Sequence, residues 1–170
     1  MTYLMRTLSV IYLAGAGLAL PPLALAHPVA AFAEIKAAPL TGAAAEAARV
    51  VDAFHAALKA GETSRAASMM APGVLVFEAG GAEASRAAYG AEHLTADATF
   101  EKTALEEILR RTGAAAGHSA WIATEGRAQA RAGEKVTDRL TTETMILART
   151  ADGWRIVHVH WSSRANPPPH

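Results

Sequence analysis

Two histidines, His158 and His160, occupy alternate positions in the segment WRIVHVHWSS, residues 154–163. Alternating β-branched and aromatic residues predict a strand, in which successive side chains point to opposite faces of the sheet. Ile156, His158, His160 and Ser162 would then share one face, which we expect to point inward. An unpaired buried polar group costs about 1–3 kcal/mol. The two imidazoles therefore predict hydrogen-bond partners or a bound metal.

A second group of reactive side chains lies in the segment 86–100, which has helical character. Tyr89, Glu92, His93 and Asp97 fall roughly on one face of such a helix, because residues three or four apart are neighbours. A carboxylate one turn from an imidazole can orient the ring, bind a metal beside it, or take part in general base catalysis. A solvated ion pair explains the same spacing equally well.

The two groups together suggest one pocket lined by imidazole and carboxylate. Such a set suits a divalent metal, Zn²⁺ or Cu²⁺, although no cofactor is certain, and its candidate ligands are His93, His158, His160 and Asp97. The other predicted pocket residues are Glu78, Glu92, Glu143 and Trp154. The alternative is that these histidines are structural and bonded to carboxylates or threonine hydroxyls. His55 and His118 are expected on the helix surface and at a strand start.

Composition excludes several classes of function. Of 170 residues, 16 are Lys or Arg and 16 are Asp or Glu, so no overall field attracts nucleic acid or an anionic membrane. The chain has no cysteine, which removes disulfides, thiolate metal sites and a cysteine nucleophile. Its length and 51% hydrophobic content predict one domain with a core.

The N-terminus has the pattern of a signal peptide. Arg6 precedes an apolar stretch, and Ala-Leu-Ala ends at residue 26, as signal peptidase prefers. We expect a periplasmic or secreted protein with no membrane association after cleavage. The predicted divisions are a signal peptide at 1–26, a linker at 27–42, a domain at 43–165 and a disordered tail at 166–170.

Periodicity predicts helices before strands. An amphipathic helix from residue 41 ends before Gly61, and a shorter one from residue 64 to 70 is ended by Pro72. The Asp152-Gly153 pair predicts a hairpin. Helix propensity favours a helix at 103–112. The predicted strands are 74–78, 118–131, 136–150 and 154–163.

Three stretches resemble the nuclear transport factor 2-like superfamily, and more narrowly its exported bacterial SnoaL-like members: APGVLVFEAGG, YGAEHLTADATF and TTETMILARTADGWRIVHVHWSS. The resemblance covers roughly residues 43–164. It implies an α+β fold, a cone-shaped barrel in which three helices of the N-terminal half pack on a strongly curved antiparallel sheet and leave a pocket at the open end. It also implies a strand at 103–112 against local propensity, and frequent homodimers through the sheet surface.

Three functions fit these observations. We favour an exported protein that binds a small ligand or a divalent metal, because the sequence offers several imidazoles and no strong nucleophile. The alternative is a cofactor-independent isomerase or dehydratase, with His93 and Asp97 as general base and Tyr89 or His160 polarising a carbonyl. The third is a non-catalytic dimerisation or interaction domain.

Overall fold

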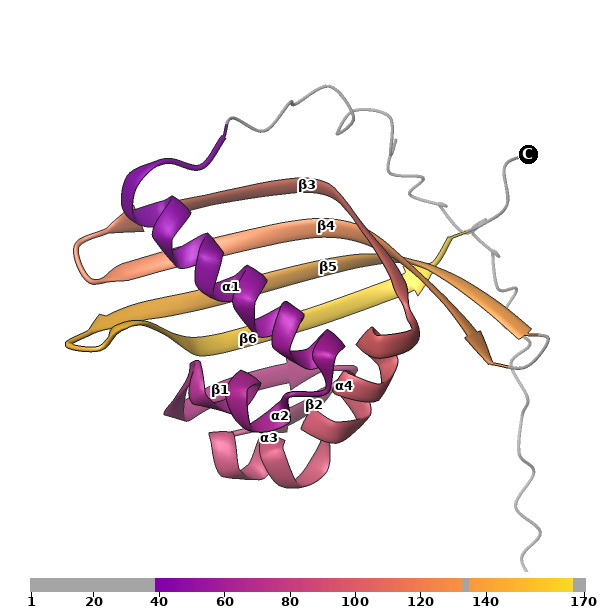
Figure 1. The fold of residues 1–170 in the computed structure, drawn as a ribbon. Helices are drawn as coiled ribbons and strands as arrows, with labels where there is room; N and C mark the ends of the chain where they lie inside the picture. Colours follow the sequence, from indigo (N-terminus) through magenta and orange to yellow (C-terminus); the bar gives the residue numbers. More distant parts are fainter. Residues whose placement is uncertain (1–38, 133–134, 167–170) are drawn as a thin grey trace, which may run out of the picture. The chain divides into compact units, whose positions relative to one another are not determined.

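The computed structural model describes residues 39–132 and 135–166, which form an α+β unit with a curved sheet that does not close (Figure 1). The predicted fold class is therefore confirmed. In chain order its elements are α1 Gly42–Ala60, α2 Thr63–Ser68, β1 Met70–Glu78, β2 Gly81–Glu83, α3 Arg86–Glu92, α4 Leu94–Thr103, β3 Leu105–Ala116, β4 Ser119–Ala132, β5 Lys135–Thr150 and β6 Gly153–Ala165.

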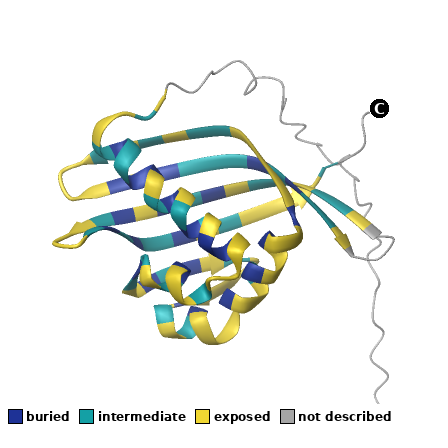
Figure 2. Ribbon diagram, in the orientation of Figure 1, coloured by how far each residue is buried: buried dark blue, intermediate teal, exposed yellow. Residues whose placement is uncertain are grey.

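Helix α1 crosses one face of the sheet, as Figure 1 shows. Its apolar stripe includes Val51, Phe54 and Leu58, which are fully buried. The helix ends where the sequence predicts, because Gly61 adopts the left-handed conformation (φ 75°) that a side chain disfavours. Buried residues are concentrated where this helix lies over the strands (Figure 2).

The six strands are ordered β2-β1-β6-β5-β4-β3. Neighbouring strands are antiparallel, as predicted, except β1 and β6, which are parallel. Ile122, Met145 and Val159 project from three adjacent strands into the same core as α1. The sheet thus has an inner face under the helices and an outer face away from them.

Two predicted helices have different limits in the structure. Helix α2 ends at Ser68 and β1 already begins at Met70, before Pro72. The proline is tolerated because the pairing of β1 with β6 is irregular between Met70 and Leu75. The segment expected to be one helix is divided at His93 into α3 and α4.

Residues 105–116 form a strand, as the resemblance implied and local propensity did not. Strand β3 pairs antiparallel with β4 along its length. Only its pairing partner supplies the hydrogen bonds that make a strand preferable here, so tertiary context overrides propensity.

A bulge in β6 changes which side chains face inward. His158 pairs with Ile146 and Ile156 with Leu147, so Val157 has no partner in β5. The extra residue shifts the alternation of the strand by one position. The expectation that Ile156 and the two histidines share the inner face is therefore wrong: Ile156 and Val159 are fully buried, and the histidines lie on the outer face.

The predicted signal peptide and most of the linker lie outside the described residues, as does the tail beyond Asn166. Export stays a prediction, which N-terminal sequencing of the exported protein would check by finding His27 as the first residue. Within the ranges that the structure describes, no helix combines the length and the hydropathy needed to cross a bilayer.

Candidate functional site

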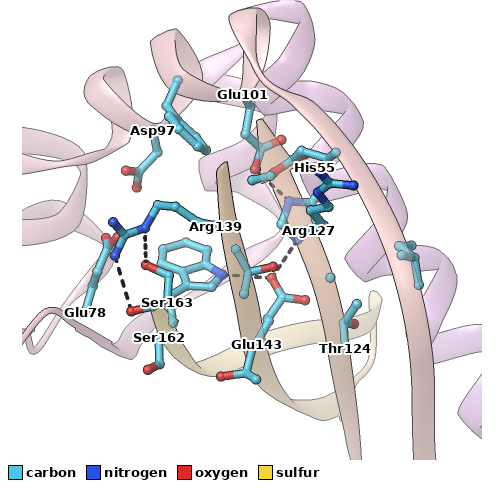
Figure 3. A pocket seen from close by; sticks show the side chains of 18 of the residues that line it. His55, Glu78, Asp97, Glu101, Thr124, Arg127, Arg139, Glu143, Ser162 and Ser163 are labelled. Atoms are coloured by element: carbon cyan, nitrogen blue, oxygen red, sulfur yellow. Dashed lines mark hydrogen bonds and ion pairs between the residues drawn. The ribbon is translucent and has the colours of Figure 1, made fainter. Parts of the chain in front are cut away.

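A cavity of about 730 Å³ lies among α1, α4 and the sheet, with further lining from the end of β1 (Figure 3). Its walls are rich in ionisable groups. The acidic ones are Asp52, Glu78, Asp97, Glu101, Glu106, Glu107 and Glu143, and the basic ones include His55, Lys59, Arg111, Arg127 and Arg139. A concave site with this many convergent polar groups is the natural place to look for ligand binding or chemistry.

His55, Glu101 and Glu143 form a chain of hydrogen bonds in this cavity, which we call the His55 trio. The Nδ1 of His55 lies 2.7 Å from Oε1 of Glu101, and its Nε2 lies 2.7 Å from Oε2 of Glu143. The indole of Trp161 donates to the same Glu143 oxygen at 2.8 Å. The two glutamates are only 6% and 9% exposed. Figure 3 shows the three side chains meeting from α1, α4 and β5.

Both ring nitrogens of His55 must donate if both carboxylates are ionised, so the geometry requires the imidazolium form. Burial disfavours that charge, but the hydrogen bonds and the negative charges of Glu101 and Glu143 outweigh it and raise the pKa of His55 to about 10. Burial likewise opposes ionisation of Glu143, yet His55 and Trp161 keep the pKa of this carboxyl below its usual value. At neutral pH His55 is a bound cation and cannot act as a base.

Asp97 carries a second polar contact on the wall. The hydroxyl of Tyr89 donates to Oδ2 of Asp97 at 2.7 Å. Tyr89 is fully buried, and Asp97 is half-buried at the cavity surface. Burial raises the pKa of Asp97, although the Tyr89 hydrogen bond favours its ionised form. This combination gives a carboxylate that is oriented and more basic than one in water.

Glu78 belongs to the same end of the cavity as Asp97, and both side chains lie on one side of the view in Figure 3. Burial raises the pKa of Glu78, and the negative charge of Asp97 raises it further. No described residue donates a side-chain hydrogen bond to Glu78, whereas Tyr89 donates one to Asp97. When the two carboxyls hold a single proton, it therefore favours Glu78.

The three histidines of the predicted metal set occupy different surroundings. His158 donates from Nδ1 to the backbone oxygen of Leu75 at 2.9 Å, and the exposed His160 has its ring on the outer face of the sheet, against Phe77. His93 contacts Glu83 through Nδ1. Within the described ranges, one cluster of three or more ligand groups has its atoms within 4.8 Å of one another, and it consists of Glu83, Glu92 and His93.

The predicted pocket residues also differ in their positions. Glu78 and Glu143 line the cavity, but Glu92 and Trp154 do not. Trp154 is 4% exposed within the hydrophobic core, with the guanidinium of Arg149 5.4 Å from its ring centre. The indole is buried because Trp154 precedes the bulge and therefore points to the same inner face of the sheet as Ile156.

Sequence reasoning missed His55 and Glu101, the residues at the centre of the site. One signal was present: His55 lies four residues after Val51 and three before Leu58, within the apolar stripe of α1. A histidine in a buried stripe requires polar partners. Nothing in the local pattern identifies Glu101 as one of them.

The chain belongs to the SnoaL-like domain family, whose model matches residues 47–166. The fold is that of the nuclear transport factor 2-like superfamily, as the sequence resemblance predicted. Comparison with curated proteins gives no match.

Among solved structures, a protein of Shewanella frigidimarina provisionally described as a ketosteroid isomerase is 34% identical, with a TM-score of 0.66 over 71% of this chain and 98% of that one. A Xanthomonas campestris protein provisionally described as a calcium/calmodulin-dependent protein kinase II association domain is 24% identical, with a TM-score of 0.62 over 77% and 93%. A Streptomyces avermitilis protein provisionally described as a dehydratase is 17% identical, with a TM-score of 0.59 over 72% and 96%. The last two likenesses show the fold alone.

The His55 trio predicts a pH-dependent contribution to stability. Because folding raises the pKa of His55 from about 6.5 to about 10, the contribution is complete below pH 6.5 and is lost as the pH rises through 10. Replacing His55 with Gln should lower the free energy of unfolding by roughly 3–5 kcal/mol near pH 6.5, because two buried carboxylates lose their cation. Urea unfolding of both proteins from pH 6 to 10 should show the difference shrinking with pH.

The exposed His118 provides the matched control, since His118→Gln should change stability little at any of these pH values. A His55→Gln difference that stays constant or grows between pH 6.5 and 10 would contradict the imidazolium assignment.

Proposed function

We propose that the protein binds a small carbonyl compound in the cavity and moves a proton on it, as an isomerase or dehydratase does. The observation that carries this proposal is the 2.7 Å hydrogen bond from the Tyr89 hydroxyl to Asp97 at the cavity wall. It supports the catalytic alternative over binding alone, because a binding site has no need of an oriented carboxylate with a raised pKa.

Asp97 is the general base in this proposal. Among the described residues, no side chain donates a hydrogen bond to its second oxygen, Oδ1, which can therefore accept a proton from a carbon acid while Oδ2 is held by Tyr89. Tyr89 is a positioning residue here, and its hydroxyl proton is already committed to Asp97. This differs from the expectation that Tyr89 polarises the carbonyl.

Glu78 is the general acid in this proposal. Burial and the nearby negative charge of Asp97 raise the pKa of Glu78 and so favour its neutral form. A neutral carboxyl can donate a hydrogen bond to a carbonyl oxygen. The substrate loses a proton to Asp97 while the developing enolate oxygen receives the hydrogen bond from Glu78. The same pair then returns the proton to another carbon in an isomerisation, or assists departure of a hydroxyl group in a dehydration.

The similarity to a protein provisionally described as a ketosteroid isomerase, at 34% identity, supports this reaction class. That description belongs to the Shewanella frigidimarina protein. The chemistry proposed for this chain depends on its own Asp97, Tyr89 and Glu78.

Activity is tested with a panel of β,γ-unsaturated and β-hydroxy ketones, followed by the absorbance of the conjugated enone. Asp97→Asn should lower kcat/KM by about 10²- to 10⁴-fold, because the base is lost while the shape of the side chain is kept. Tyr89→Phe should keep part of the activity but move the acidic limb of the pH profile to higher pH, because the ionised form of Asp97 loses its hydrogen bond.

Glu62→Gln, an exposed carboxylate paired only with Arg65, is the control and should leave kcat/KM unchanged. Full activity in Asp97→Asn would contradict the assignment of the base. Ligand binding without turnover in the wild-type protein would contradict the enzymatic proposal and favour the binding alternative.

We also propose that two copies of the chain associate through the outer face of the sheet. Adjacent rows on this face carry no Asp, Glu, Lys or Arg, and Phe77, Trp121 and Ile146 on it are 37%, 43% and 39% exposed. By strand register the rows consist of Leu75, His158, Ile146, Trp121 and Ala114, and of Phe77, His160, Thr144, Ala123 and Thr112. An uncharged, partly aromatic patch of this kind is typical of an interface.

Trp121→Glu should convert a dimer into a monomer in sedimentation velocity, because a carboxylate would be buried at the interface without a partner. Leu105→Glu, at the far end of β3 and 73% exposed, should leave the dimer intact. A wild-type protein that sediments as a monomer at micromolar concentration would contradict this proposal.

A further inference from the structure

Glu83, Glu92 and His93 form a compact cluster outside the cavity lining, which we call the β2/α3 cluster. One potential ligand atom from each side chain lies within 4.8 Å of the other two. The Nδ1 of His93 is in direct contact with Oε1 of Glu83. None of the three lines the cavity, so the cluster is distinct from the proposed catalytic site.

Glu83 is the unusual member, because it is only 6% exposed. Among the described residues, no side chain outside the cluster forms a hydrogen bond or an ion pair with it. The nearest arginine in the sequence, Arg86, donates instead to the backbone oxygen of Met70 at 3.2 Å. A buried carboxylate is costly without a cation, and one contact with an exposed imidazole is weak compensation for it.

The backbone brings the cluster together in two ways. Glu83 pairs with Val76 in the short β1–β2 hairpin, which fixes its position beside α3. In a continuous helix the adjacent residues Glu92 and His93 would point in different directions. The interruption at His93, with φ −113° and ψ −32°, lets both side chains approach Glu83.

We propose that the β2/α3 cluster binds a divalent transition metal, with Zn²⁺ as the best fit. One imidazole nitrogen and two carboxylate oxygens are ligands that Zn²⁺ accepts, and three protein ligands leave a fourth position for water. Ligands in a tetrahedral zinc site lie about 3–3.5 Å apart, so small side-chain rotations from the present positions suffice. Soft Cu⁺ is disfavoured because the cluster offers no sulfur.

The metal would join β2 to the junction of α3 and α4. In the chain, His93 stands between Tyr89 and Asp97: its backbone N–H donates to the backbone oxygen of Tyr89, and its backbone oxygen accepts from the backbone N–H of Asp97, both at 3.0 Å. A bound ion would therefore stiffen the backbone that holds Tyr89 and Asp97. Its role is stabilisation, since the cluster itself does not reach the cavity.

The test is calorimetric titration of the chelator-treated protein with Zn²⁺ alone. We expect one equivalent to bind in the wild-type protein and the melting temperature to rise by several degrees, because the ion binds only the folded state. His93→Ala and Glu92→Gln should each weaken binding by at least tenfold. Both residues are exposed, and circular dichroism would verify that each variant remains folded.

His118→Ala is the matched control for the loss of one exposed histidine and should leave Zn²⁺ binding unchanged. Asp97→Asn should also retain it, which separates this proposal from the catalytic one. Wild-type affinity in His93→Ala or Glu92→Gln, or no stoichiometric binding in the wild type, would overturn the proposal. Equal loss of binding in a His158→Ala, His160→Ala variant would do the same and point to the outer face of the sheet.

Discussion

The buried charges of the His55 trio are the constraint on which the rest of the site depends. Glu101 from α4 and Glu143 from β5 are nearly inaccessible to water, and a single imidazolium on α1 compensates both. Two helices and the sheet are thereby fixed to one another at the cavity. Trp161 extends the arrangement, because its indole bonds Glu143 while its ring stacks near Phe54 of α1, with centroids 6.4 Å apart. Burying these charges costs desolvation free energy, but separating them would cost more, so the trio holds the cavity in one shape.

The same hydrogen bonds also limit which groups of the cavity are available to exchange a proton with a ligand. Because both nitrogens of His55 are bound to carboxylates, the proposed reaction assigns the acid and base roles to Glu78 and Asp97, whose pKa values are raised. The same superfamily fold occurs in proteins described as isomerases, dehydratases and association domains, so the fold alone selects none of these. The proposal of proton transfer therefore depends on side chains of this chain, Asp97 bonded to Tyr89 and the nearby Glu78, and not on the fold.

The division of the predicted helix at His93 serves several features at once. It sends α3 and α4 in different directions, so that Tyr89 and Asp97 meet across the junction, and it brings Glu92 and His93 toward Glu83. The outer face of the sheet is separate from both. Its histidines bond a backbone oxygen or pack on Phe77, which gives them structural partners away from the β2/α3 cluster.

The sequence by itself determined the features that depend on neighbours along the chain. These include the apolar stripe of α1 and its end at Gly61, the hairpin before β6, and the family motifs that indicated the α+β cone and the strand at β3. It also identified Tyr89, Asp97, Glu78 and Glu143 as candidates. Only the tertiary structure decided which of them meet. The partners of His55 are 46 and 88 residues away, and the inward face of β6 depends on a bulge at Val157 that exists only through pairing with β5. Local periodicity assigns side chains to alternate faces of a strand. It cannot show that strand pairing leaves one residue unpaired, or which charged groups approach from distant elements.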